Sequence, residues 1–422
     1  MAFRDYRAHA VPENGAMLRF AIALFAVQAG FHGFTAALPL TLARGGVPDP
    51  QIGLIVGLAA LIQIPAAFAV GVLIDRFGGR RIFAVGGAAY LAGTATLLLP
   101  GVEPSGALWP FALARVFQGI GLASTLPSAL SLVPRLLPST RQGFGLAFMG
   151  SAHNLTLVVL PPVSLAVLAG GSLDDVAVLV ALLVLSGLTL AVVTPIGGGQ
   201  TEATGPGSIG VARRRFGFAM RSTWIRPLAI MFLYVAHWGV VTAYLPQRAE
   251  AAGADIGLFF VADGIAILLL RLPSGWLADR MRPVILVTAG LVATAVAVML
   301  LALPPTTPIL ILAGVLTGAG GGIVITPLLV ELSRRSAEAD RGSAFSLFSS
   351  SLAGALVLGS VGAAPIVAAA GFEAAILATL GGLFLAALVA LSDPPLRQGR
   401  ARDAPDSLGA VADAPGPGRN ED

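Results

Sequence analysis

Long apolar stretches separated by short polar breaks dominate the chain. Twelve of them are roughly 18 to 25 residues long, which is enough to cross a bilayer as α-helices. They lack the strict two-residue alternation of a membrane β-barrel, so we predict twelve transmembrane helices with internally satisfied backbones. The predicted spans are 17–42, 52–74, 82–99, 108–133, 143–168, 176–196, 228–245, 256–277, 284–303, 309–332, 344–370 and 372–391.

The longest polar break divides these spans into two groups of six. It covers 197–227, is rich in Gly, Thr and Ser and then in Arg, and predicts a cytoplasmic linker between bundles at 17–196 and 228–391. Residues 1–16 precede the first bundle as a cytoplasmic N-terminus. The tail 392–422 is polar and has no apolar period, so we expect it to be disordered. Gly371 alone separates the last two spans.

The composition excludes a soluble globular protein. Charged residues make up 11% of the chain, against about 25% in soluble domains, and the mean hydropathy is +0.86. Every basic residue is Arg, so a Walker A loop, which needs Lys, is absent and any pumping must draw on a gradient. The chain has no Cys. The 26 basic and 22 acidic residues nearly balance, and we expect no nucleic-acid partner.

The placement of arginine predicts the orientation in the membrane. With the N-terminus inside, 21 of the 26 basic residues fall in inner segments, whereas the outer loops hold Arg44 and Arg248. The positive-inside rule therefore places both termini in the cytoplasm, as an even number of spans requires. The arginines at 213–215 are typical of topology signals and lipid-surface anchors.

The two halves share a short pattern of Gly, Asp and Arg. Three residues of the first half recur at a constant spacing of 204, and a glycine of the fourth span recurs at 199. Such parallel six-span repeats suit a transporter whose two bundles rock about a substrate. The pairs are Gly71 and Gly275, Asp75 and Asp279, Arg76 and Arg280, and Gly119 and Gly318.

The loop after the second span carries a complete motif. The pattern G-x-x-x-D-[RK]-x-G-x-[RK]-[RK] is filled at every specified position, and the fourth span adds R-x-x-Q-G-x-G. The residues that fill the two patterns are Gly71, Asp75, Arg76, Gly78, Arg80 and Arg81, then Arg115, Gln118, Gly119 and Gly121. With its twelve spans and central linker, the chain resembles the major facilitator superfamily over nearly its whole length. The resemblance implies an all-α membrane protein of two pseudo-symmetric six-helix bundles that alternate access to a central cavity.

The same resemblance implies a conformational gate at this loop. A glycine permits close helix approach, and the charged residues can contact a helix end, an acidic partner or lipid phosphates. Arg80 and Arg81 suit a topology signal equally well. The second-half copy lacks the later Gly and the paired basic residues, which predicts a weaker latch on that side. The gate set is Gly71, Asp75, Arg76, Gly78, Arg80, Arg81, Gly275, Asp279 and Arg280.

Ionisable residues inside the predicted spans are rare and therefore informative. Asp263 is the only acid well inside a span, and its protonation would remove a charge from the membrane interior, so it is our candidate for proton coupling. A structural partnership with an arginine on another helix is the alternative. Arg115 matches the arginine that the resemblance links to proton coupling, or it anchors span four to span one. Arg271 lies two turns from Asp263, about 80° round the helix, so direct pairing is difficult.

Polar side chains at helical spacing predict the faces that bind substrate. Hydrogen bonding between helices is the alternative for each of them. Four scattered histidines without carboxylate neighbours at ligand spacing do not form a zinc site, so we expect no metal and no cofactor. The substrate-binding candidates are Gln28, His32, Gln118, His153, Asn154, Tyr234, His237 and Arg271.

The favoured function is proton-coupled export of a small organic solute such as a drug, sugar or metabolite. The surroundings of Arg271 resemble span eight of bacterial sugar-efflux and drug-efflux relatives. Span five lacks the Gly-Pro motif of many proton antiporters in this superfamily, so an importer or facilitator of an organic anion remains an alternative. We expect a monomer in a bacterial inner membrane whose partners are the solute, protons and the lipid bilayer.

Two function classes outside transport make demands that the sequence does not meet. No acid–base pair or activated nucleophile stands at a membrane edge, so we expect no enzymatic activity. A non-transporting membrane sensor would be expected to carry a signalling domain, and the linker and tail are too short and polar for one.

Overall fold

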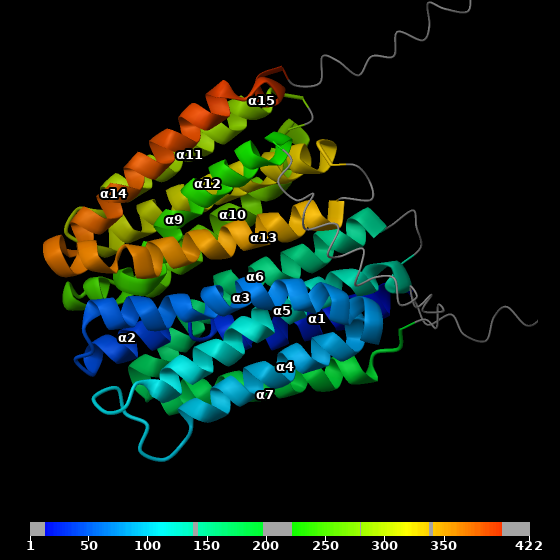
Figure 1. Cartoon of the computed structure of the whole chain (residues 1–422). Coiled ribbons are helices and arrows are strands. Elements are labelled where there is room, and N and C mark those ends of the chain that lie inside the picture. The colour runs from blue at the N-terminus through cyan, green and yellow to red at the C-terminus, as the bar shows by residue number, and fades with distance from the viewer. Residues whose placement is uncertain (1–12, 138–141, 197–221, 279, 337–340, 399–422) are drawn as a thin grey trace, which may run out of the picture.

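The computed structural model describes residues 13–137, 142–196, 222–278, 280–336 and 341–398. Within these ranges the chain is almost entirely helical and contains no strand (Figure 1). Nine segments of this described part are long and apolar enough to cross a membrane. The first half contains α1 (Glu13–His32), α2 (Ala37–Arg44), α3 (Asp49–Phe77), α4 (Gly79–Leu97), α5 (Trp109–Leu136), α6 (Gln142–Gly170) and α7 (Leu173–Val193). The second contains α9 (Ser222–Ala251), α10 (Ile256–Ala278), α11 (Pro283–Leu301), α12 (Thr307–Arg334), α13 (Arg341–Val357), η4 (Leu358–Gly362), α14 (Ala364–Ser392) and α15 (Pro394–Gln398).

The first predicted span is broken into α1 and α2. In the connecting turn, the amides of Phe34 and Thr35 bond to carbonyls three residues earlier rather than four. Gly33 has a low helix propensity, and without a side chain it lets Val180 of α7 pack against the backbone. This tight turn directly follows His32, a predicted substrate-binding residue.

The last two predicted spans are joined by special backbone geometry. The first of them contains α13, the single π-turn η4 and the start of α14. At Gly371 the backbone has φ 82° and ψ 175°, a region that is essentially restricted to glycine. The predicted break at Gly371 is therefore confirmed, and it separates two helices that run in opposite directions within α14.

The helices form two bundles that lie side by side (Figure 1). The first bundle holds α1 to α7, coloured blue to green, and the second holds α9 to α15, coloured green to red. Each has an apolar core of its own, with Phe20 and Phe83 in the first and Trp224 and Phe259 in the second. The predicted all-α fold of two six-span bundles is confirmed.

The glycine repeat has a structural counterpart in both bundles. Gly119 of α5 packs against the backbone carbonyl of Ala59 in α3, and Gly318 of α12 packs against the backbone carbonyl of Asp263 in α10. Neither position leaves room for a Cβ atom. Small residues allow such close packing where lipid supplies no hydrophobic force between helices.

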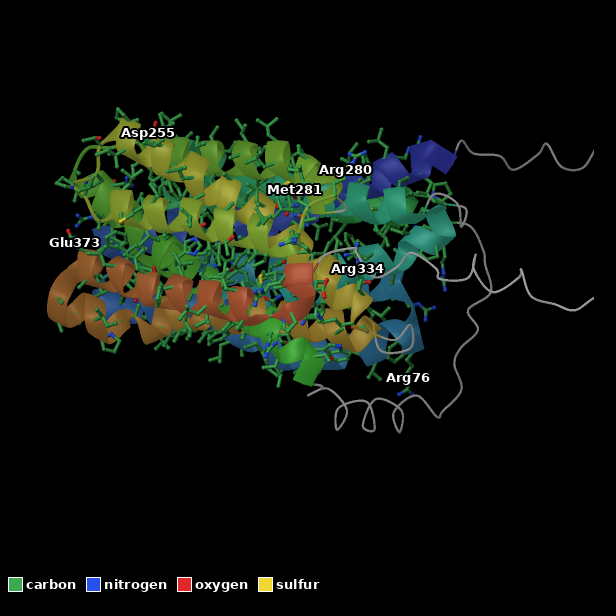
Figure 2. All side chains as sticks on the ribbon, turned by 90° about the horizontal axis from the view of Figure 1, so that it is seen from above. Arg76, Asp255, Arg280, Met281, Arg334 and Glu373 are labelled. Atoms are coloured by element: carbon green, nitrogen blue, oxygen red, sulfur yellow. The ribbon has the colours of Figure 1, made fainter. Side chains whose placement is uncertain are left out.

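The molecule has two ends, which we name by their helices. The proximal end is where α1 begins and α14 finishes, and the distal end is where α2 finishes and α3 begins. Figure 2 shows Arg76, Arg280 and Arg334 toward the proximal end and Asp255 and Glu373 at the distal end. Exposed large apolar side chains cover the helices between the two ends, as expected for a surface in contact with lipid.

The predicted boundaries of the polar segments need correction. The chain does not become irregular at residue 392, because Asp393 is buried and Pro394–Gln398 forms α15. Helix α9 begins at Ser222, within the predicted linker, and α1 begins at Glu13, within the predicted N-terminal segment. Helical hydrogen bonding continues past the apolar stretch, so hydropathy alone predicts helices that are too short. Residues 1–12, 197–221 and 399–422 lie outside the described residues.

Candidate functional site

Gln28 is the centre of a polar cluster in the first bundle. It lies in α1, is fully buried, and accepts hydrogen bonds from the hydroxyls of Tyr90 in α4 and Thr125 in α5 at 3.0 and 2.9 Å. Its amide nitrogen lies 2.5 Å from Nδ1 of His153 in α6. The cluster thus joins four helices, and two predicted residues, Gln28 and His153, are in contact. Tyr90 was not predicted, although it is the only tyrosine in the first six predicted spans.

A second group lies one turn away along α1. The ring of His32 makes edge contacts with Phe31 and His153, at centroid separations of 5.1 and 5.4 Å. Arg115 of α5 donates a hydrogen bond of 2.9 Å to Oε1 of Gln118, and its guanidinium lies 5.5 Å from the centroid of the Phe31 ring. A continuous line of contacts therefore runs from Arg115 through Phe31 and His32 to His153.

Several buried polar atoms of this group have no hydrogen-bond partner among the described residues. They belong to His32, Arg115, Gln118 and Asn154, all of which are at least nine-tenths buried. An unpaired polar group in a protein interior is costly, so each such atom calls for an explanation. The atoms are His32 Nδ1 and Nε2, Arg115 Nε, Gln118 Nε2 and Asn154 Nδ2.

Asp263 is the centre of the polar group in the second bundle. It lies in α10, is 4% exposed, and accepts a hydrogen bond of 2.8 Å from the hydroxyl of Thr317 in α12. Tyr234 of α9 lies within electrostatic range of the Asp263 carboxylate. Nδ1 of His237 lies 2.5 Å from the backbone carbonyl of Tyr234, and the two rings are 5.3 Å apart. Thr317 was not predicted, because nothing in its glycine-rich surroundings marks it.

The two polar groups approach each other where α6 packs against α10. Gly264 of α10 contacts Val158 of α6, which places the two helices close together midway along the bundle. The Arg271 guanidinium acts electrostatically on the His153 ring across this contact. Arg271 and Asp263 do not form an ion pair, in accord with their angular separation on α10.

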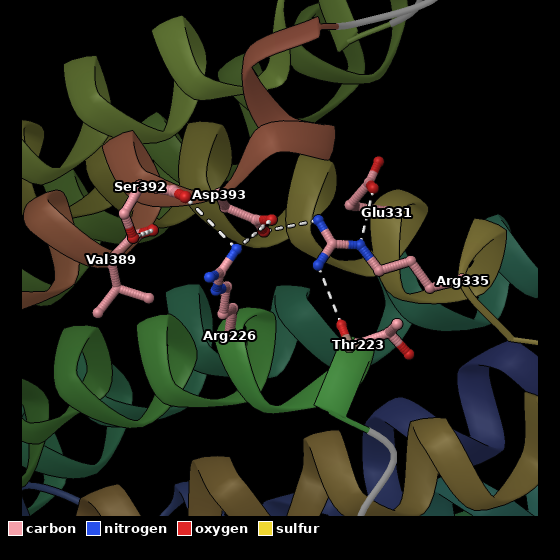
Figure 3. Close-up of polar contacts among 7 residues, drawn as sticks. All are labelled: Thr223, Arg226, Glu331, Arg335, Val389, Ser392 and Asp393. Atoms are coloured by element: carbon pink, nitrogen blue, oxygen red, sulfur yellow. Dashed lines mark hydrogen bonds and ion pairs between the residues drawn. The ribbon is translucent and has the colours of Figure 1, made fainter. Parts of the chain in front are cut away.

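Two further acids are buried, and both are paired with arginine (Figure 3). Arg335 Nε lies 2.8 Å from Glu331 Oε1, and Arg335 Nη2 lies 2.6 Å from Asp393 Oδ2. Arg226 of α9 approaches the other oxygen of Asp393 at 3.5 Å. Sequence reasoning missed this network. Glu331 and Arg335 are one helical turn apart and could have been paired, but Asp393 lies 58 residues further along.

The bundles contact each other directly at the distal end. Arg44, at the end of α2, forms an ion pair with Glu250 of α9. Gly53 of α3 packs against the Tyr244 hydroxyl of α9 and the backbone carbonyl of Ser360 in η4. The Tyr244 hydroxyl donates a hydrogen bond of 2.5 Å to that carbonyl. Gly53 thus allows α3 to lie flush against the second bundle.

The family model of the Major Facilitator Superfamily matches residues 20–255 and 228–416, which is nearly the whole chain. The chain belongs to the major facilitator superfamily. It is therefore a multi-pass membrane protein of a family of transporters.

Relatives and solved structures agree with this assignment. The chain is 30% identical over 162 residues to an uncharacterised MFS-type transporter of Mycobacterium tuberculosis, a match that covers 36% of this chain and 26% of that protein. A match of 33% identity over 130 residues to an uncharacterised MFS-type transporter of Methanocaldococcus jannaschii covers 31% of this chain and 32% of that protein. These matches thus span only about a quarter to a third of the curated relatives.

Among solved structures, the fold is similar to a D-xylose–proton symporter, with a TM-score of 0.72 and 18% identity, covering 92% of this chain and 99% of that one. It is also similar to the human organic anion transporter MFSD10, with a TM-score of 0.66 and 18% identity, covering 90% of this chain and 99% of that one. At this level of identity the likeness shows the fold alone.

The superfamily loop motif lies at the proximal end of the first bundle. Gly78 has φ 85°, and this left-handed backbone lets α3 stop and α4 start within one residue. Gly71 borders open space. Arg76 lies 5.2 Å from the ring centroid of Phe77, and Arg80 donates a hydrogen bond to the Val192 carbonyl of α7. These contacts are made within the first bundle.

The remaining gate candidates are placed less completely. Arg81 is exposed at the start of α4, and Arg280 lies at the proximal end next to α10, which carries Gly275 (Figure 2). The side chain of Asp75 and all of Asp279 lie outside the described residues. Within the described ranges, no group of three or more His, Cys, Asp or Glu side chains is arranged to hold a metal ion.

Proposed function

We propose that this superfamily member exports a small organic solute in exchange for protons, by alternating access to the polar groups between its bundles. The observation that supports this is the environment of Asp263. Of the buried acids in the described part of the chain, Glu331 and Asp393 each contact an arginine, whereas Asp263 has only the neutral Thr317 hydroxyl. A carboxylate without a compensating positive charge is costly in the membrane interior, and protonation removes that cost. Asp263 is therefore suited to gain and lose a proton.

The proposed coupling cycle uses both bundles. Proton uptake neutralises the Asp263 carboxylate, and proton release restores a negative charge that the Thr317 hydroxyl must stabilise. Arg115 lies in the first bundle, in contact with Gln118 and Phe31, and we assign it a role in binding the solute there. Solute and proton then bias the same rearrangement of the bundles without touching each other.

The gate assignment follows from the contacts at the two ends. The distal contacts of Arg44 with Glu250 and of Gly53 with Tyr244 hold the bundles together there, while Gly71 faces open space at the proximal end. This arrangement supports a state closed at the distal end. In the opposite state, the loop motif with Gly71, Asp75 and Arg76 would hold the proximal ends together.

We propose that the proximal end faces the cytoplasm of a bacterial cell and that the protein works as a monomer in the inner membrane. Among the described residues, Arg76, Arg280 and Arg334 lie toward the proximal end (Figure 2), which favours this orientation under the positive-inside rule. The linker at 197–227 would then connect the bundles on the cytoplasmic side.

The decisive experiment uses inside-out vesicles with an acid interior and a pH-sensitive dye. Lipophilic cations, sugars, amino-acid derivatives and organic anions are added one at a time to vesicles that carry the wild-type chain or Asp263→Asn. An antiporter is expected to dissipate the pH gradient when its solute is added, and Asp263→Asn is expected to abolish that response while still binding the solute. The matched control is Glu103→Gln, an exposed acid of the α4–α5 loop, which should respond like wild type.

The outcomes separate the assignment of the residue from that of the function. A wild-type response in Asp263→Asn would exclude Asp263 as the coupling site. Absence of any response from folded wild-type protein across the panel would exclude proton exchange with these solutes and redirect the search to uptake in the opposite direction.

A further inference from the structure

The charge inside the site does not balance. Arg115 is 1% exposed and Arg271 is largely buried, and neither forms an ion pair with a carboxylate among the described residues. Asp263 is bonded to Thr317 and does not compensate either arginine. The site therefore stays positive whether Asp263 is ionised or neutral. Buried arginines without a carboxylate to balance their charge are costly, and an anion from outside the chain would supply the missing charge.

The unpaired atoms of the first bundle point to the same kind of ligand. Arg115 Nε, Gln118 Nε2 and Asn154 Nδ2 all carry N–H groups, so each of them needs an acceptor. Both ring nitrogens of His32 are also buried without a partner, and a ring of this kind can donate from at least one of them. A ligand that is rich in acceptor oxygens satisfies this group better than a cation or an apolar molecule.

The arrangement of these groups suggests where each part of the ligand lies. Arg271 lies on α10 about two turns from Gly264, which contacts Val158 of α6, and His153 lies about one and a half turns before Val158 on α6. This packing brings the Arg271 guanidinium within electrostatic range of the His153 ring. From His153 the line of rings continues through His32 and Phe31 to Arg115. The positive groups thus stand at the two ends of an aromatic stretch.

We infer that the solute is an organic anion with a planar body and further acceptor oxygens. Its acidic group binds between Arg271 and His153, its planar part lies along His32 and Phe31, and its other acceptor oxygens reach Arg115 and Gln118. This inference rests on the proposed function, because it names the substrate class of the same site. Arg271 and His153 belong to different bundles, so an anion bound by both compensates the Arg271 charge and links the two bundles. Asp263 lies outside this subsite and remains available to the proton.

The test compares carboxylates with their neutral amides on purified full-length protein in lipid nanodiscs. Benzoate, phenylacetate and indole-3-acetate are titrated beside benzamide, phenylacetamide and indole-3-acetamide, and binding is followed by tryptophan fluorescence and by calorimetry. The carboxylates are expected to bind about tenfold or more tightly than the amides, since a charge-assisted hydrogen bond to arginine is lost with the charge.

Variants locate the site. Arg271→Gln is expected to lower carboxylate affinity about tenfold or more without changing the binding of the amides, and Arg271→Lys is expected to recover part of the loss. The matched control is Arg135→Gln, which makes the same substitution at an exposed arginine near the end of α5. It should bind all six probes like wild type. The thermal unfolding of each variant without ligand shows whether it is folded.

The proton-flux assay distinguishes a failure of the anion inference from a failure of the proposed proton exchange. Equal binding of carboxylates and amides, or carboxylate binding that Arg271→Gln leaves intact, overturns the anion inference. If neutral solutes then trigger proton flux that depends on Asp263, the proposed function stands without it. Carboxylate binding that depends on Arg271, with no proton flux on addition of any carboxylate, overturns proton exchange and leaves the anion subsite in place.

Discussion

Single buried charges reveal their role by their neighbours. Arg335 compensates Glu331 and Asp393, so the cost of burying those two carboxylates is offset within the protein. Asp263, Arg115 and Arg271 lack such compensation among the described residues. Removing one member of the first network would leave an unpaired charge and destabilise the fold. Removing Arg115 or Arg271 would instead change which solutes the site can bind, and removing Asp263 would change its response to protons.

A second feature of individual residues is the backbone at Gly371. Its φ of 82° and ψ of 175° are strained for any residue with a Cβ, so Gly371→Ala is expected to lower the free energy of unfolding by about 1–3 kcal/mol. Denaturation in detergent micelles measures this change. Gly381→Ala is the matched control, because Gly381 lies in the same helix with open space beside it. There, alanine should leave stability unchanged or raise it by up to about 1 kcal/mol. Equal losses in both variants would contradict the strain argument.

Helices of the two bundles contact each other at the distal end and midway along the molecule. At the distal end, α2 meets α9 through Arg44 and Glu250, and α3 meets η4 and α9 through Gly53. Midway along, α6 meets α10 through Val158 and Gly264. In the proposed alternating access, the α2–α9 and α3–η4 contacts separate when the distal end opens, and the α6–α10 contact is the proposed pivot.

Linking α2 to α9 should therefore stop transport. The chain has no native Cys, so Arg44→Cys with Glu250→Cys introduces the only two thiols. Before cross-linking, the double variant should still give solute-triggered proton flux, since an exposed ion pair contributes only about 0–1 kcal/mol. A reducible bis-maleimide is expected to abolish the flux, and reduction should restore it. The single variants treated with the same reagent are the controls. Full flux in the cross-linked protein would show that the distal ends do not separate.

The whole molecule has a direction that its arginines set. The labelled arginines Arg76, Arg280 and Arg334 lie toward the proximal end, and the labelled acids Asp255 and Glu373 lie at the distal end (Figure 2). An asymmetry of this kind fixes the orientation during insertion, because positive loops stay on the cytoplasmic side.

Labelling of single cysteines tests that orientation. Gly106→Cys lies in the distal loop between α4 and α5, and Met281→Cys lies in the proximal loop between α10 and α11; both positions are exposed. A membrane-impermeant maleimide added to intact cells is expected to label the first, and to label the second only after permeabilisation. The reverse pattern would place the proximal end outside.

Much of the fold could be predicted from the sequence because the hydrocarbon core of the membrane restricts which backbone structures can cross it. It demands long apolar segments with closed backbone hydrogen bonding, which is why the spans, the two bundles and the break at Gly371 followed from local patterns. The break after His32 did not follow, because it depends on how Gly33 packs against α7. The burial of Asp393 after α14 did not follow either, because its partners Arg335 and Arg226 come from other helices.

The candidate site also has a part that the sequence predicted and a part that only the structure shows. Asp263, Arg115 and Arg271 could be singled out by the sequence alone, because an ionisable group inside an apolar span is conspicuous whatever surrounds it. Which groups meet is a matter of helix packing. Only the tertiary structure brought Gln28 together with Tyr90, Thr125 and His153 and gave Asp263 its Thr317 partner. It also left Arg115 and Arg271 without a carboxylate partner among the described residues. Apolar periodicity sets where a helix runs and which face it buries, but contacts between side chains far apart in the chain depend on how the bundles pack.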